Sequence, residues 1–251
     1  MTRKMKDSGV EWIGKIPEDW NIIILKRTIK SRMGGAWGDT PKNNENDIIC
    51  IRIADFEYTK LKIKQNVTYT KRNYANDTIN KLTLKKGDIL VEKSGGGELT
   101  PVGRTVIFKL PVLALYANFI DRLRIYKDIS SDYIQYLLVS FYYNGITKKY
   151  VKQTTGIQNL DLTTMLLKEK IPLPIIKEQY SISNYLDTKC TKIDQTIERQ
   201  KQVIEKLKEY KKSIITEAVT KGLNTNVKMK HSGVEWIGEI PENWKIRKIK
   251  Y

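Results

Sequence analysis

The sequence predicts an α+β protein in which one mixed α/β domain precedes a long helix. Residues 21–176 contain several short segments rich in β-branched and apolar residues, and one segment whose apolar residues have helical spacing. Residues 177–221 contain neither proline nor glycine, and their apolar side chains recur at helical spacing. Residues 5–20 return as residues 229–244 with 13 of 16 positions identical. We therefore expect a domain over 1–176, a helix over 177–222, and over 223–251 a linker with the start of a second, truncated copy of the domain.

Four segments of the first domain have the composition of β-strands, namely residues 47–56, 87–94, 103–110 and 118–126. The second and third of these flank a glycine-rich loop. Residues 131–144 begin with Ser-Asp and continue with helical apolar spacing, which predicts a capped helix. Pro172 and Pro174 mark the end of the domain, because a helix cannot continue through them.

The long helix carries a heptad pattern that predicts a coiled coil. Seven of the ten seam positions are aliphatic or alanine, and a cysteine adds an eighth. A helix of about 45 residues is roughly 65–70 Å long and cannot bury such a seam alone, so we expect a second subunit to supply the partner helix. Packing on its own domain is the alternative. The polar seam residues fit a register-setting role, and Gly222 ends the helix. The seam positions are Leu186, Cys190, Ile193, Ile197, Gln200, Ile204, Leu207, Lys211, Ile214 and Ala218.

The formal net charge is +17, and residues 21–176 alone account for +11 of it. A positive field of this size attracts a polyanion, and nucleic acid is the usual one. A solvated basic surface that binds no particular partner is the alternative interpretation.

Motifs for catalysis are missing from the sequence. The stretch from Gly97 to Thr105 lacks P-loop spacing, and neither a dinucleotide-binding fingerprint nor an amino-methyltransferase motif is present. Two distant cysteines and the single histidine, His231, give no metal pattern. No apolar run approaches the roughly 18–20 residues that cross a bilayer, and the N-terminal stretch does not resemble a signal peptide. We expect a cytoplasmic, metal-free, non-catalytic binding protein.

Several stretches, in their order, resemble the specificity subunits of type I restriction-modification systems. The opening DSGVEWIGKIPEDW is similar to the start of that family's target-recognition domains. Further matches are a glycine-and-TP loop with its strand, a GDIL strand with its glycine-rich loop and GR turn, the junction to the long helix, and the helix end. They are MGGAWGDTPKNNENDIICIRIADF (33–56), GDILVEKSGGGELTPVGRTVIF (87–108), GIQNL (156–160) with IPLPIIKEQYSISNYLD (171–187), and ITEAVTKGL (215–223).

The resemblance implies a non-catalytic subunit in which each recognition domain reads one half of a bipartite DNA site. Family members are tandems of two such domains, separated by two helices that form an antiparallel coiled coil. Methyltransferase subunits carry S-adenosylmethionine, and motor-nuclease restriction subunits use ATP and Mg²⁺. This sequence departs from the tandem, with one domain, one helix and the start of a second repeat. We therefore expect a half-length form that pairs with a second copy and reads a symmetric, interrupted site.

Candidate DNA contacts lie in loops, where glycine permits close backbone approach and Arg or Lys can contact guanine or phosphate. For the glycine loop the alternative is a flexible hairpin tip, and for the last group it is a solvated helix face. The tryptophans of the opening stretch are expected in the core. The candidates are Arg32, Gly34, Gly35, Trp37, Thr40 and Lys42; Lys93, Ser94, Gly95, Gly96, Gly97, Glu98, Thr100 and Arg104; and Lys148, Lys149, Lys152 and Gln153.

Two other functions stay open at this point. A DNA-binding coiled-coil regulator unrelated to restriction would bind DNA without recruiting a methyltransferase. A basic nuclease with an unrecognised active site would cleave DNA in the presence of magnesium.

Overall fold

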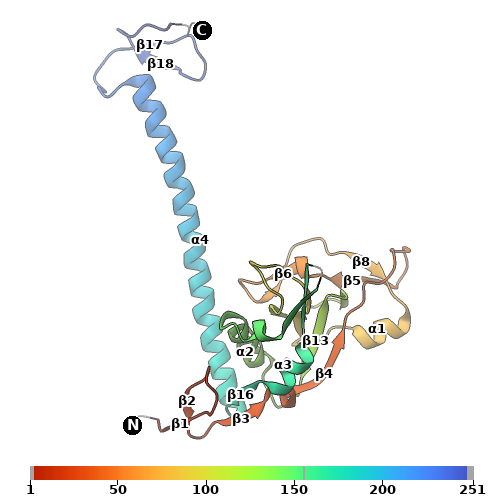
Figure 1. Cartoon of the computed structure of the whole chain (residues 1–251). Helices are drawn as coiled ribbons and strands as arrows, with labels where there is room; N and C mark the ends of the chain where they lie inside the picture. The colour runs from red at the N-terminus through yellow and green to blue at the C-terminus, as the bar shows by residue number, and fades with distance from the viewer. Residues whose placement is uncertain (1–2, 155, 248–251) are drawn as a thin grey trace. The chain divides into compact units, whose positions relative to one another are not determined.

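The computed structural model describes residues 3–154 and 156–247. The chain divides into two compact units, residues 1–191 and residues 192–251. The first unit contains the larger sheets, three short helices and the beginning of the long helix α4, and the second contains the rest of α4 and a small hairpin (Figure 1). This is the mixed α/β architecture with a long helix that the sequence predicts.

The strands of the first unit are short, and most run for two to six residues. They are β1 Met5–Asp7, β2 Lys15–Pro17, β3 Asn21–Ile24, β4 Ile29–Gly34, β5 Asp47–Ile51, β6 Phe56–Glu57, β7 Lys62–Ile63, β8 Lys71–Asn73, β9 Ile89–Glu92, β10 Ser94–Gly95, β11 Thr105–Ile107, β12 Ala114–Tyr116, β13 Ile120–Ile125, β14 Val151–Thr154, β15 Ile157–Leu160 and β16 Lys170–Leu173. The α-helices are α1 Asn76–Leu82, α2 Ser131–Tyr143, α3 Leu162–Lys168 and α4 Ile176–Lys221, and the 3₁₀ helices are η1 Leu25–Thr28, η2 Ile53–Asp55 and η3 Thr147–Tyr150. The second unit adds β17 Met229–His231 and β18 Glu239–Pro241.

The central sheet has six strands in the order β4-β13-β9-β11-β7-β6. Its first four strands pair antiparallel, while β11 and β7 pair parallel. A second sheet has the order β12-β5-β8, and a third has the order β10-β15-β14. Because β10 follows β9 almost directly, the third sheet continues from one end of a central strand.

Both faces of the central sheet are buried. Along β9, Ile89 and Val91 face a core that includes Phe141 of α2, while Leu90 faces a second core with the β5 and β12 strands. Successive side chains of a strand point to opposite faces, so burial on both faces explains the nearly continuous apolar run of this segment.

The predicted strand over residues 47–56 is shorter in the structure. It ends at Ile51, and a 3₁₀ turn follows before β6. Asp55 causes this turn, because its carboxylate accepts from the Arg52 backbone N at 2.8 Å and pairs with the Arg52 guanidinium at 3.1 Å. The proline-marked segment forms β16 against β3, where Pro172 lies opposite Ile22.

Helix α4 begins at Ile176 and ends at Lys221, close to the predicted bounds. At its beginning, Gln179 accepts from the Ser130 backbone N and donates to Pro174 O, which ties the first turn to the domain. At its end, Gly222 has φ +76 and donates to Ala218 O at 3.1 Å, a left-handed C-terminal cap. The compact first unit extends to residue 191, so the domain division predicted at 176 and 222 stays a prediction.

No helix among the described residues is both long enough and apolar enough to span a bilayer. Within the same residues, no group of three or more His, Cys, Asp or Glu side chains is placed to hold a metal ion.

Candidate nucleic-acid interface

A buried carboxylate on the central sheet joins two of the predicted DNA-binding cations. Asp121 of β13 lies opposite Gly34 of β4 on one side and Val91 of β9 on the other, and it is 2% exposed. Arg32 Nε donates to Asp121 Oδ2 at 2.5 Å. Lys93 Nζ lies 2.9 Å from Oδ1, as an ion pair without hydrogen-bond geometry. One acid therefore holds a cation from each flanking segment.

Both cations are partly exposed to solvent, while the nitrogen of each that contacts Asp121 is held in place. The Arg32 side chain is 28% exposed and the Lys93 side chain 29% exposed. Arg32 Nη1 also donates to Thr163 Oγ1 at 2.6 Å. Because leaving a buried carboxylate unpaired costs several kcal/mol, the two cations are held in place. Fixed positive groups at the edge of a sheet suit phosphate or base-edge contacts.

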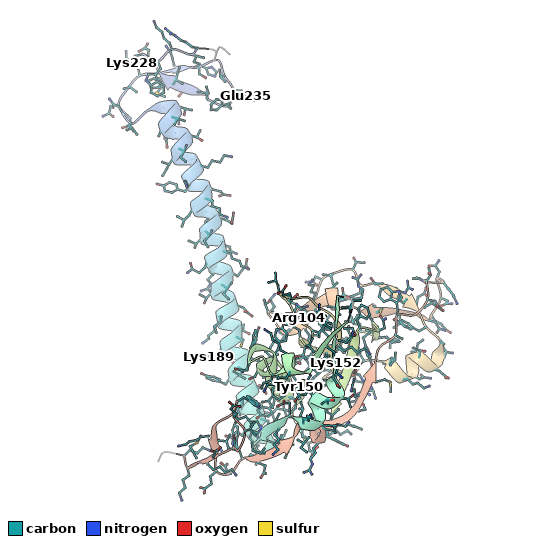
Figure 2. The ribbon with its side chains drawn as sticks, in the orientation of Figure 1. Arg104, Tyr150, Lys152, Lys189, Lys228 and Glu235 are labelled. Carbon is teal, nitrogen blue, oxygen red and sulfur yellow. The ribbon has the colours of Figure 1, made fainter. Side chains whose placement is uncertain are left out.

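Arg104 makes a different kind of contact. Its Nε and Nη2 donate to the two carboxylate oxygens of Glu92 at 2.8 and 3.1 Å, and Glu92 is 1% exposed. The guanidinium also lies 3.7 Å over the Tyr58 ring. Burial lowers the Arg104 pKa, but the Glu92 contact outweighs it, so the net pKa is raised. Burial, and then the nearby Glu92 charge, raise the pKa of the Tyr58 hydroxyl. Arg104, which is labelled in Figure 2, therefore belongs to a structural pair with Glu92, and its predicted reading of a base stays a prediction.

The glycine-rich loop forms a closed turn. Gly97 N donates to Thr100 O at 3.0 Å, and Gly96 has φ +61 with Val102 N only 2.8 Å from where a Cβ would lie. Gly103 has φ +105, and a Cβ there would lie 2.1 Å from Thr147 Cγ2. Only glycine fits these two positions. The tip of the turn, which includes the predicted contact residues Glu98 and Thr100, is exposed.

The third sheet brings the glycine loop beside another predicted group. In one row of this sheet, Asn159 of β15 lies between Ser94 of β10 and Lys152 of β14. In the next row, Gln158 lies between Gly95 and Gln153. Ser94 Oγ donates to Asn159 Oδ1 at 2.7 Å. Segments almost sixty residues apart thus form one surface.

A hollow of about 260 Å³ lies beside Trp37, one of the predicted DNA-binding residues. Its exposed aromatic side chains are Trp37 and Phe119, which are 41% and 45% exposed. Phe119 O accepts from Lys93 N at 2.9 Å, and the Arg72 guanidinium lies 4.8 Å from the Trp37 ring centroid. Phe119, Arg72 and Asp121 were not among the sequence candidates. The hollow is lined by Trp37, Arg52, Ile53, Ala54, Ala117, Asn118 and Phe119.

The other candidates lie outside the Asp121 cluster. Thr40 and Lys42 are exposed in the loop before β5, where the Lys42 backbone N donates to the Asp47 carboxylate at 3.0 Å. Gly35 is held at the end of β4, because its N donates to Ile120 O at 2.9 Å. Lys148 and Lys149 are exposed on η3, and their ammonium groups contact no acid among the described residues.

The predicted seam of α4 lies on the exposed surface of this chain. Its aliphatic members from Ile193 to Ile214 are between 45% and 59% exposed, and Gln200 and Lys211 are exposed with them. Leu186, Cys190 and Ala218 are partly buried. Such a row of exposed aliphatic side chains is unusual on a soluble protein unless a partner covers it.

Residues 17–209 match the family described as the type I restriction modification DNA specificity domain. The match covers more than half of the chain. This chain belongs to that family. The resemblance seen in the sequence is thereby confirmed, and with it the class of protein.

Curated relatives and solved structures agree with the family. The chain is 31% identical over 242 residues to the putative type I restriction enzyme MjaX specificity subunit of Methanocaldococcus jannaschii, covering 93% of this chain and 52% of the relative. It is 28% identical to the MjaVIII specificity subunit of the same organism, covering 83% and 47%. The chain therefore spans about half the length of these relatives.

Two solved structures share the fold. One, described as the structural basis of complex assembly and conformational transition of the type I R-M system, has a TM-score of 0.63 at 20% identity and covers 87% of this chain and 49% of its own. The HsdS subunit from Thermoanaerobacter tengcongensis has a TM-score of 0.53 at 18% identity, covering 87% and 48%. At this identity the likeness shows the fold alone.

Proposed function

We propose that this chain is the sequence-specific DNA-recognition subunit of a type I restriction-modification complex, and that its first unit reads one half of a bipartite site. Family membership supports the class of function. The observation that carries the assignment to this surface is the buried Asp121, which holds Arg32 and Lys93 beside the glycine loop. A pair of anchored cations next to a close-approach loop is suited to reading a duplex.

Base reading is assigned to the Asp121 cluster and the neighbouring hollow. Arg32 and Lys93 contact base edges or the adjoining phosphates, and Trp37 with Phe119 packs against the apolar edges of bases, where a thymine methyl is the natural partner. Lys148, Lys149 and Lys152 contact phosphate and contribute affinity for every sequence. Arg104 positions the loop through Glu92.

Catalysis is assigned to other subunits. The curated relatives carry the name specificity subunit, and the chain directs an adenine methyltransferase and a restriction motor-nuclease to the site. S-adenosylmethionine, ATP and Mg²⁺ are then bound by those subunits. The cell compartment proposed is the cytoplasm.

The partner of the α4 seam is a second copy of this chain. The exposed aliphatic row of α4 supports this assignment, because such a row needs a cover. An antiparallel pair of the 46-residue helices, each roughly 69 Å long, separates two identical recognition domains. Such a dimer reads a symmetric site whose half-sites lie one or more DNA turns apart, with each turn about 34–36 Å.

Mapping methylated adenines in cells that carry this chain and its methyltransferase tests the proposal. The expected result is a palindromic motif interrupted by a spacer of unspecified sequence. A motif that is not palindromic contradicts the homodimer and indicates pairing with a different half-subunit. If no motif depends on the chain and it does not co-purify with the methyltransferase, the regulator is favoured. Magnesium-dependent cleavage by the isolated chain favours the nuclease.

A further inference from the structure

The repeated stretch folds twice into the same hairpin. In the first copy, β1 pairs with β2, Ser8 N donates to Gly14 O at 3.0 Å, and Gly14 N donates to Val10 O at 3.1 Å. In the second copy, β17 pairs with β18, Ser232 N donates to Gly238 O at 2.9 Å, and Gly238 N donates to Val234 O at 3.0 Å. What the first hairpin contacts therefore indicates what the second can contact.

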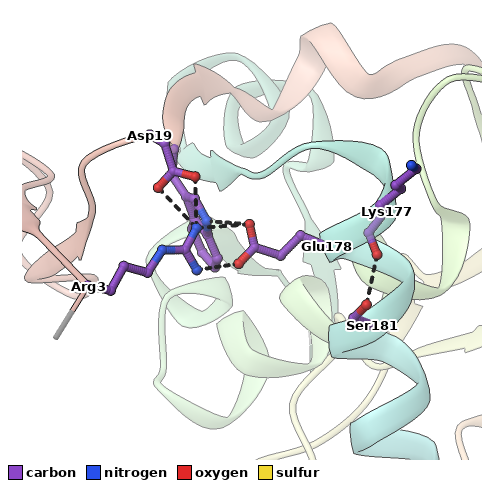
Figure 3. A network of polar contacts seen from close by, with 6 residues as sticks. Arg3, Asp19, Lys177, Glu178 and Ser181 are labelled. Atoms are coloured by element: carbon purple, nitrogen blue, oxygen red, sulfur yellow. Dashed lines mark hydrogen bonds and ion pairs between the residues drawn. The ribbon is translucent and has the colours of Figure 1, made fainter. Parts of the chain in front are cut away.

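The first hairpin docks on the recognition domain through two tryptophans. Trp12 packs edge-on against Phe141 of α2, with ring centroids 5.1 Å apart and planes at 84°. Trp20 Nε1 donates to Glu178 Oε2 at 2.8 Å in the first turn of α4. Arg3 lies between Asp19 and Glu178 and pairs with both (Figure 3).

In the second hairpin one tryptophan contacts a helix end and the other is exposed. Trp244, the twin of Trp20, lies against Gly222 at the end of α4, its ring 3.3 Å from where a Cβ on Gly222 would lie. Ile240 of this hairpin is 4% exposed. Trp236, the twin of Trp12, is 72% exposed. Its neighbour Glu235 is labelled in Figure 2.

We propose that Trp236 is a docking residue for a second copy of this chain, where it takes the position against Phe141 that the copy's own Trp12 otherwise occupies. This rests on the antiparallel dimer proposed above, because that arrangement brings the end of one α4 beside the beginning of the other. The second tryptophan of each hairpin already lies at a helix end, Trp20 at the beginning and Trp244 at the end. One hairpin at this junction then joins the helix of one copy to the domain of the other.

The two hairpins differ where the first makes its ion pairs. Val227 and Asn243 replace Arg3 and Asp19, so the second hairpin cannot form the Arg3 contacts with Asp19 and Glu178. The first hairpin is also continuous in the chain with β3 of its own domain. In the proposed exchange, Trp12 therefore holds the position against Phe141 in most molecules, and Trp236 takes this position when the first hairpin is weakened.

Photo-crosslinking of the full-length chain tests this. The photoreactive residue benzoylphenylalanine replaces Trp236, and crosslinked dimers are counted on a denaturing gel and mapped by mass spectrometry. The expected product joins position 236 to the α2 peptide of the other copy. Trp12→Ala raises its yield about tenfold, because losing an aromatic pair and its packing is worth roughly 1.4 kcal/mol. Arg3→Ala, which leaves the core intact, raises the yield roughly twofold.

Matched controls separate docking from random collision. Benzoylphenylalanine at Leu99, which is 96% exposed in the glycine-rich loop and away from this junction, gives only background dimers, and at position 12 it gives crosslinks within one chain. If the protein is dimeric by light scattering but neither Trp12→Ala nor Arg3→Ala gives a crosslink to α2, the exchange of Trp236 for Trp12 is overturned and the dimer remains supported. A monomer at micromolar concentration overturns both.

Discussion

Replacing Arg104 by alanine removes one half of a buried ion pair and is expected to destabilise the first unit. Glu92 is 1% exposed, and the Arg104 side chain is 21% exposed. Removing one partner of a fully buried pair costs about 3–5 kcal/mol, and partial exposure of Arg104 reduces this to roughly 2–4 kcal/mol. For a unit of about this size each kcal/mol lowers Tm by about 2–4 °C, so the expected shift is roughly 5–15 °C.

The assay is urea unfolding followed by circular dichroism, with DNA binding measured well below the lowered Tm. The double variant Glu92→Leu with Arg104→Met removes both charges, and it should recover most of the lost stability because no buried charge is left unpaired. If Arg104→Ala lowers the free energy of unfolding by less than about 0.5 kcal/mol, the structural assignment of this pair is refuted. A loss of specificity at one base pair in a stable variant would then favour base reading.

Three further results are expected. Leu207→Asp should weaken the dimer at least about 100-fold, since two buried leucines are lost per dimer at about 1.5–3 kcal/mol each. Lys201→Asp, which lies off the seam, should leave the dimer affinity unchanged, and equal effects of the two variants would exclude the predicted seam. Lys149→Ala should flatten the salt dependence of log K by about 0.9 on every duplex, and a sequence-dependent change would argue against a phosphate contact. Hydrogen bonding from Lys152 lowers the pKa of Asp161 to about 2, so its contribution to stability should be complete above about pH 4 and should be lost as pH falls towards 2. A carboxyl NMR titration checks this, and Lys152→Ala should move the midpoint upward.

The strands β5, β9, β11 and β13, the helices α2 and α4 and the cap at Gly222 could be predicted from local sequence because their signals are local. Alternation, an N-cap and a glycine after a heptad pattern each act within a few residues. The η2 turn could not be predicted, since the strand composition continues through Ile53 and only the Asp55 carboxylate breaks the ladder. The small sheet β10-β15-β14 depends on pairing between distant segments, which local propensity does not encode.

The candidate interface was predictable only in part. Arg32 and Lys93 stand out as cations beside glycines, but nothing local says that one acid joins them. Asp121 itself gave little signal, because β13 also carries Arg122 and Arg124, and a charged residue in a strand with this alternation is as readily read as exposed as it is read as buried and paired. For Arg104 the local pattern predicted base reading, while the partner that occupies its guanidinium, Glu92, lies across the strand pair.

The strand register around Asp121 also limits how the proposed DNA interface can evolve. Inserting or deleting one residue in β4 would turn Arg32 to the opposite face of the sheet and leave Asp121 unpaired on that side. Substitutions at the tips, and length changes in the loops over residues 35–46 and 96–101, leave that register intact. New target sequences are therefore expected to arise by exchange of loops on a conserved frame of strands, with insertions and deletions absent from β4, β9 and β13.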